Sequence, residues 1–313
     1  MNVWNALDAF PTGREPLVAT IGNFDGVHLG HQAILVSVTA AAKARSAPSL
    51  VITFDPHPLA VVSPGRRPKL LQTRRQKLET LESSGVDGVL ILPFDRALAS
   101  LDGEAFFGGY LAERLCFASV HVGRNFRFGR ARGGDLHMLE AIGRSRGFTV
   151  VGVPHVEVDG EVVSSSAIRA AVEAGEVERA RAMLGRPYSI TGLVVRGDGR
   201  GRLLEFPTAN LAVDNELLPR RGVYVTETSA FATRFPSITN VGVRPTFGGS
   251  SLIVETHLLD VDEDLYDERL EVRFLARLRD EQKFGAVAEL ADQIARDRAA
   301  ALSFFSGLSL ARR

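Results

Sequence analysis

The sequence predicts an α/β domain with a mostly parallel sheet, followed by a small antiparallel β-barrel and a closing helix. Before Gly185, short apolar runs alternate with helical patterns, which is typical of strand–helix–strand crossover units. After Pro187, strand patterns follow one another with no helix between them, which favours a small closed barrel. At 313 residues the chain exceeds the usual size of a single core, so we expect two domains, 1–186 and 187–313.

The individual elements follow from these patterns. In the first domain the predicted strands are 17–21, 50–54, 88–92, 119–122 and 148–153, and the predicted helices are 32–44, 74–83, 104–115 and 136–146. Two further helices follow: one is opened by 164–169, and the other spans 177–184 and ends at Gly185. In the second domain the predicted strands are 188–195, 223–228, 237–241, 253–259 and 270–278, and the closing helix is 286–301.

The composition is that of a soluble globular protein, 45% hydrophobic and 24% charged. Lys and Arg number 37 and balance 37 Asp and Glu, which argues against a general nucleic-acid binder. No apolar run approaches the length of a membrane span, and the N-terminus lacks a signal-peptide pattern. The single cysteine, Cys116, lies in an apolar helical stretch, so we expect a packed core residue in a cytoplasmic protein.

The chain is organised around the stretch from Gly22 to His31. It joins a buried strand to a helix through a tight polar turn, and a helix start offers unpaired N–H groups that suit a phosphate. His28 and His31 are three residues apart, so both imidazoles lie on one face if the helix begins near Val27. The alternative is that the two histidines only support the turn.

The segment His28-Leu-Gly-His31, with Gly-Asn-Phe-Asp-Gly directly before it, resembles the H-x-G-H motif of nucleotidyltransferases. Segments 53–58, 123–129 and 163–169 are similar to those of one branch, the bifunctional riboflavin kinase and FAD synthetase family of bacteria. The resemblance implies that the first domain is a Rossmann-like nucleotidyltransferase domain that makes FAD from FMN.

The resemblance also implies roles for residues of this domain. His28, His31 and Arg169 would stabilise charge on the α-phosphate and pyrophosphate of ATP. The nucleotide or its magnesium would be contacted by Gly22, Asn23, Phe24, Asp25, Asn125, Ser164 and Ser165. Phe128 would stack on the flavin ring. Taken singly, Asn125 could be only a turn former, Ser165 an ordinary helix cap and Phe128 a core residue.

In the second domain, the stretch from Arg196 to Asn210 is a glycine-rich loop that runs into Pro-Thr-Ala-Asn, and it resembles the riboflavin kinase motif. Glycines let backbone N–H groups approach phosphates closely, although this is no Walker A loop. The resemblance assigns Gly197 and Arg202 to ATP, and Thr208 and Asn210 to ATP and Mg²⁺. Glu205 stands where the family usually has glycine, and its acid could repel phosphate or point to solvent.

Transfer of a phosphoryl group to an alcohol needs a base near the hydroxyl. The resemblance places this base at Glu255, in the strand after the segment that begins at Asn240. An isolated Glu in a strand would more often lie on a solvated surface. The resemblance also implies that Arg279 helps to hold the flavin nucleotide.

The sequence therefore predicts an enzyme that phosphorylates riboflavin to FMN and adenylylates FMN to FAD, releasing pyrophosphate. Its substrates would be riboflavin, FMN and ATP with Mg²⁺, with no nucleic-acid or membrane partner. One alternative is an FAD synthetase whose barrel binds flavin but is inactive because of Glu205. The other is a non-catalytic flavin or nucleotide sensor, which would bind without releasing pyrophosphate.

Overall fold

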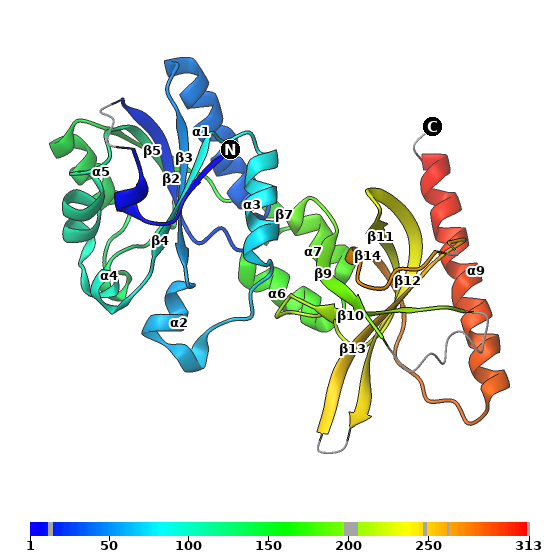
Figure 1. The fold of residues 1–313 in the computed structure, drawn as a ribbon. Coiled ribbons are helices and arrows are strands. Elements are labelled where there is room, and N and C mark those ends of the chain that lie inside the picture. Colours follow the sequence, from blue (N-terminus) through cyan, green and yellow to red (C-terminus); the bar gives the residue numbers. More distant parts are fainter. Residues whose placement is uncertain (12–14, 197–205, 247–248, 262, 312–313) are drawn as a thin grey trace. The chain divides into compact units, whose positions relative to one another are not determined.

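The computed structural model describes residues 1–11, 15–196, 206–246, 249–261 and 263–311. Packing divides the chain into two units, Met1–Ser165 and Ser166–Arg313 (Figure 1). Nearly all of helix α6 (Ser165–Ala174) and the whole of α7 (Val177–Leu184) therefore belong with the second unit. The expected boundary between catalytic domains after residue 186 stays a prediction.

A parallel sheet of six strands lies at the centre of the described part of the first unit. Its order is β1-β4-β3-β2-β5-β6, from β1 (Asn2–Trp4), β2 (Leu17–Ile21), β3 (Ser49–Asp55), β4 (Gly88–Pro93), β5 (Phe117–Gly123) and β6 (Thr149–Val153). The chain steps from β2 to β4 in one direction and then continues with β5 on the other side of β2. In such sheets ligands bind where the order reverses, at the carboxyl ends of β2 and β5.

The strands predicted for this unit are all present, and β1 is an addition that pairs in parallel with β4. Three residues are too few to show a periodic pattern. The helices are α1 (Leu29–Arg45), α2 (Pro58–Val62), α3 (Arg74–Ser83), α4 (Arg96–Ser100) and α5 (Leu136–Arg146), with short 3₁₀ turns η1 (Leu7–Ala9), η2 (Pro64–Arg66) and η4 (Arg130–Arg132). A small hairpin, β7 (Glu157–Val158) with β8 (Glu161–Val162), precedes α6.

The helix expected over 104–115 takes a different form. Its centre, η3 (Ala105–Leu111), is a π-helix, whose wider turn is rare. Gly108 and Gly109 stand in the middle, and their lack of a side chain makes a regular α-helix less favourable there. The wider turn still buries Phe106, Phe107 and Leu111.

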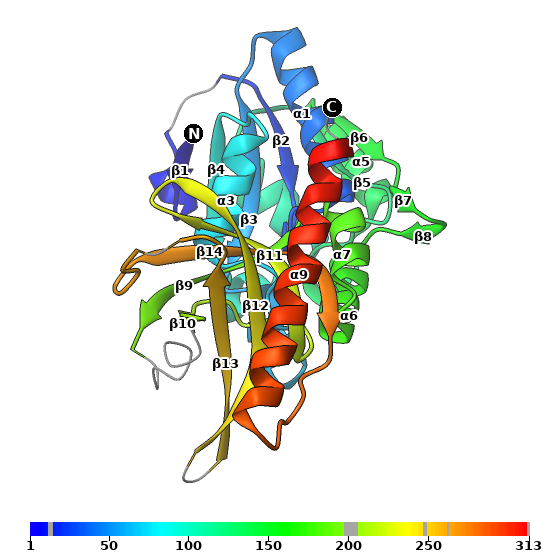
Figure 2. The ribbon, with the colours of Figure 1, turned by 90° about the vertical axis from the view of Figure 1, so that its right-hand side faces the viewer.

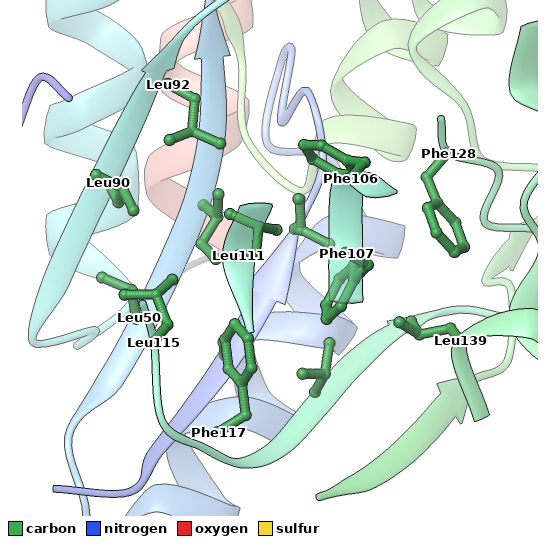
Figure 3. Packing of buried hydrophobic residues seen from close by; sticks show 14 of the residues in the cluster. Leu50, Leu90, Leu92, Phe106, Phe107, Leu111, Leu115, Phe117, Phe128 and Leu139 are labelled. Carbon is green, nitrogen blue, oxygen red and sulfur yellow. The ribbon is translucent and has the colours of Figure 1, made fainter. Parts of the chain in front are cut away.

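The main apolar core of the first unit lies on one face of the sheet (Figure 3). Leu50, Leu90 and Leu92 project from the strands toward the aromatic rings of η3. Phe107 contacts Phe117 and Phe128 with ring centroids 5.6 and 5.9 Å apart. Burial of such side chains is the dominant stabilising contribution to folding.

Cys116 is exposed, so the prediction that it is a packed core residue was wrong. Its neighbours Leu115 and Phe117 are both buried. Cys116 stands between the bend at Leu115 and the first residue of β5, outside the helical stretch that the pattern predicted. The apolar run indicated a buried segment correctly, but it could not indicate the orientation of one residue within it.

The second unit is a closed antiparallel barrel with the order β10-β13-β12-β11-β14-β9. Its strands are β9 (Tyr188–Val195), β10 (Ala209–Val213), β11 (Gly222–Ala230), β12 (Thr233–Thr246), β13 (Gly249–Leu258) and β14 (Arg269–Arg279). Strand β10 was not predicted, because it follows directly on the Pro-Thr turn. Helix α9 (Val287–Ala311) lies along the barrel (Figure 2), and its Ala301 and Phe305 pack on Val225 and Leu259.

The two faces of the barrel wall differ in character. Inside, buried hydroxyl groups bond to one another, as when Thr239 Oγ1 donates to Thr256 Oγ1 at 2.9 Å. Because side chains alternate along a strand, Glu255 and His257 lie on the opposite, outer face from Thr256.

Within the described residues, no helix has both the length and the apolar character needed to cross a membrane.

Two candidate active sites

The turn after β2 has an unusual backbone. Phe24, Gly26 and Val27 have φ values of 49°, 84° and 39°, which residues other than glycine rarely adopt. Phe24 is only 1% exposed, and a Cβ on Gly22 would lie 3.3 Å from its ring. The buried Phe24 ring therefore packs against the turn at the carboxyl end of β2.

His28 and His31 are brought together at the start of α1. The helix begins at Leu29 with His28 as its N-cap, two residues later than a start at Val27. His28 Nδ1 accepts a hydrogen bond from the backbone N–H of His31 at 3.3 Å. The two imidazoles stack with centroids 3.7 Å apart and an interplanar angle of 17°, so they do form one cluster.

His31 is neutral at neutral pH. Burial lowers the pKa of His31 well below the usual value for histidine, and His28 and Lys77 lower it further. Its Nδ1 is a buried nitrogen with no hydrogen-bond partner among the described residues. A buried ring nitrogen without a partner is costly unless it serves a ligand or a strained site.

Asp25 holds the turn to another part of the unit. It is 2% exposed, and both carboxylate oxygens accept from the backbone N–H of Leu71, at 3.0 and 3.3 Å. Its own backbone carbonyl accepts from Ser165 Oγ at 2.9 Å. The motif aspartate and the motif serine are therefore linked through the main chain, although they are 140 residues apart.

Three side chains that sequence reasoning did not select surround Asn23. Lys77 Nζ and Thr53 Oγ1 donate to the Asn23 carbonyl oxygen at 3.1 and 3.2 Å, and His57 Nε2 lies 3.2 Å from the Asn23 amide. The Asn23 atom that faces His57 Nε2 is Nδ2, and His57 Nδ1 accepts a hydrogen bond from the backbone N–H of Leu59 at 3.2 Å. Lys77 lies on helix α3, and nothing in its helical pattern indicates a contact with Asn23.

The other predicted residues of the adenylyl half lie as follows. Asn125 is exposed in the turn after β5, the strand that neighbours β2, while Ser164 precedes α6 and Arg169 lies on α6. Phe128 is 6% exposed and packs on Phe126 and Phe107. Flavin stacking by Phe128 stays a prediction, and the half-buried Phe126 ring lies parallel to it at 5.4 Å.

In the barrel, strand register forms the second cluster. Glu255 of β13 stands directly opposite Asn210 of β10 on one side and Asn240 of β12 on the other. Side chains of directly opposed residues project from the same face, with Cβ atoms about 5 Å apart. All three are half-buried, so one carboxylate and two amides form a row that a ligand could reach.

Thr208 is half-buried and lies two residues before Asn210. Hydroxyl and amide oxygens beside a carboxylate are ligands that suit Mg²⁺ when nucleotide phosphates supply most of the charge. Gly197, Arg202 and Glu205 lie outside the described residues. Among those that are described, no three His, Cys, Asp or Glu side chains gather in a way that could hold a metal ion.

Arg279 is engaged within the barrel unit. Its Nε lies 3.0 Å from Asp297 Oδ1 and its Nη2 lies 2.7 Å from Asp297 Oδ2, a two-pronged ion pair between β14 and α9. Gln293 Nε2 also donates to Asp297, at 2.8 Å. A role of Arg279 in holding flavin stays a prediction.

Fold and sites together define a class: a chain of two units, one with a turn at a helix start in a parallel sheet and the other with a row of polar side chains on a barrel. A family model described as FAD synthetase matches residues 11–167, and one described as riboflavin kinase matches residues 184–305. The chain belongs to the family of bifunctional riboflavin kinases/FMN adenylyltransferases, with the adenylyltransferase domain first.

Two relatives of that description illustrate the match. The protein of Escherichia coli (strain K12) is 39% identical over 293 residues, covering 93% of this chain and 94% of its own. That of Pseudomonas fluorescens is 41% identical over 285 residues, covering 91% of each. A solved structure described as a macrolide-efflux protein from Streptococcus pneumoniae has a TM-score of 0.87 and 28% identity, and covers 96% of this chain and 97% of its own. That last likeness supports the fold.

Proposed function

We propose that riboflavin is phosphorylated by ATP at the row formed by Asn210, Glu255 and Asn240. FMN then receives AMP from a second ATP at the turn that carries His28 and His31. The observation that carries the proposal is that each set of motif residues forms its own cluster: stacked imidazoles at a helix start in one unit, and a carboxylate flanked by amides in the other.

In the kinase step, Glu255 takes the proton of the ribityl 5′-hydroxyl. The oxygen forms a bond to the γ-phosphorus of ATP while the bond to the bridging oxygen breaks, and ADP leaves. Thr208 and Asn210 would hold Mg²⁺ with ATP, and the ion would neutralise charge on the phosphates. The half-buried position of Glu255 leaves its carboxylate within reach of a hydroxyl group.

In the adenylyl step, an oxygen of the FMN phosphate attacks the α-phosphorus of ATP and pyrophosphate leaves. The attacking group is already an anion, so no base is needed. His28 and the neutral His31 would donate N–H groups to the charge that develops, together with the amides at the start of α1. Ser164, Ser165 and Arg169 would hold the triphosphate, while Gly22, Asn23, Phe24, Asp25 and Asn125 would contact the nucleotide.

Product analysis tests the proposal. The full chain is incubated with riboflavin and MgATP, and flavins and pyrophosphate are separated over time; we expect FMN to appear first and FAD with pyrophosphate later. FAD from supplied FMN but no FMN from riboflavin would support the version in which Glu205 inactivates the barrel. Flavin binding without pyrophosphate release would support the sensor and contradict the proposal.

We also place the protein in the cytoplasm, where its substrates are expected.

A further inference from the structure

His257 is a buried histidine beside the proposed kinase row. It lies two residues after Glu255 on β13, so both side chains are on the same face of the strand. The side chain is only 8% exposed. Its Nδ1 lies 2.7 Å from the backbone carbonyl oxygen of Pro207, and a carbonyl can only accept, so Nδ1 carries the proton.

The same ring stacks on Phe206. The ring centroids are 3.5 Å apart with an interplanar angle of 25°. Phe206 also packs against the apolar cluster that holds Ile238 and Leu259 on the outer face of the barrel. The imidazole therefore holds two consecutive residues, one through its face and one through its N–H group.

These two residues directly precede Thr208. The described pairing of β10 with β13 comprises Ala209 opposite Thr256 and Asn210 opposite Glu255. Continuing that register would place Thr208 opposite His257. The paired residues of β10 and β13 end at Ala209, and before that point the His257 side chain contacts Phe206 and Pro207. Burial lowers the pKa of His257, which keeps the ring neutral at this contact.

We propose that His257 is a positioning residue of the kinase site, which fixes Phe206 and Pro207 so that Thr208 and Asn210 present their oxygens to MgATP beside Glu255. The inference rests on the proposed assignment of Thr208, Asn210 and Glu255 to that site. His257 does not itself touch the reacting atoms in this scheme. Its loss should therefore weaken MgATP binding more than it slows the chemical step.

The test compares three variants of the full chain by steady-state FMN formation. His257→Asn keeps a donor near the position of Nδ1, His257→Phe keeps the stacked ring, and His257→Ala keeps neither. We expect KM for MgATP to rise about tenfold in the alanine variant and about threefold in the others, with kcat changed less than about twofold. Leu252→Ala, an exposed position on the same strand, is the matched control and should behave as the wild type.

The outcomes separate this inference from the function on which it rests. Wild-type KM for MgATP in His257→Ala, or a fall in kcat at unchanged KM, would overturn the positioning role. Should the alanine variant not fold, wild-type KM values in both the asparagine and phenylalanine variants would overturn it equally. If Glu255→Gln retains full FMN formation, the assignment of the kinase site itself fails, whatever the His257 variants show.

Discussion

The two proposed sites hold their polar groups in different ways. In the first unit, segments distant in sequence meet at one turn through single hydrogen bonds, such as those from Leu71 N and Ser165 Oγ to Asp25. In the barrel, Asn210, Glu255 and Asn240 are aligned by continuous antiparallel ladders. A side chain in the barrel row can therefore change without moving its backbone, whereas the turn depends on the side chains that support it.

The largest effect should follow Glu255→Gln. Losing the base should lower FMN formation from riboflavin about 10²–10⁴-fold, while FAD formation from supplied FMN stays unchanged. Both rates are measured on the same preparation by separation of flavins. Glu227→Gln is the control, because Glu227 is a half-buried carboxylate on β11 away from the row. Loss of both activities in Glu255→Gln would contradict separate sites.

His31→Ala should show the reverse pattern. FAD formation from FMN should fall about 10²–10³-fold, and FMN formation should persist. Because the ring also packs on His28 and Phe24, the first unit should unfold at lower urea, as followed by fluorescence of its single tryptophan, Trp4. His155→Ala, at an exposed histidine, is the control. An unchanged rate of FAD formation would exclude His31 from the adenylyl site.

Asp297→Ala should weaken the attachment of α9 to the barrel. Arg279 would keep its charge, 17% exposed, without the carboxylate that now pairs with it. We expect a loss of about 3 kcal/mol in the free energy of unfolding, measured by loss of kinase activity in urea. Asp292→Ala, at an exposed position on the same helix, should cost less than about 0.5 kcal/mol. Equal effects of the two substitutions would refute the anchoring role.

The smallest predicted effect is a pH dependence that differs between the units. Burial lowers the pKa of His31 and His121 in the first unit and of His257 in the barrel. Above the unfolded pKa of about 6.5 these rings are neutral in both states, and below it only the unfolded chain takes up protons. The stabilisation from these neutral histidines is therefore complete above pH 6.5, and it is lost as the pH decreases toward their lower pKa values in the folded state.

The loss should approach about 1.4 kcal/mol per pH unit for each such histidine. Urea titrations followed by Trp4 fluorescence at pH 7.5, 6.5 and 5.5 measure it for the first unit. Replacing His121, whose ring nitrogens contact Ser37 and Ser119 hydroxyls, by Gln should reduce the slope by one histidine. A midpoint independent of pH in the wild type would contradict the prediction.

Much of the fold was predictable because its signals are local. Apolar runs and helical spacing indicated most strands of the sheet and of the barrel, and the motif at His28 and His31 indicated a turn that leads into a helix. Strand β1 was missed because three residues are too few to show a period, and β10 was missed because it follows directly on the Pro-Thr turn. Lys77 and His57 were missed because neither stands in a pattern that marks a contact with Asn23.

By itself, the sequence determined the order of the elements, the motifs and the family, since each depends on residues close together along the chain. Only the tertiary structure decided that Cys116 faces solvent, that Asp25 binds Leu71, and that His257 holds Pro207. Such contacts depend on strand register, ring closure of the barrel and the meeting of distant segments. Periodicity along the chain does not indicate which distant residue a given side chain will contact.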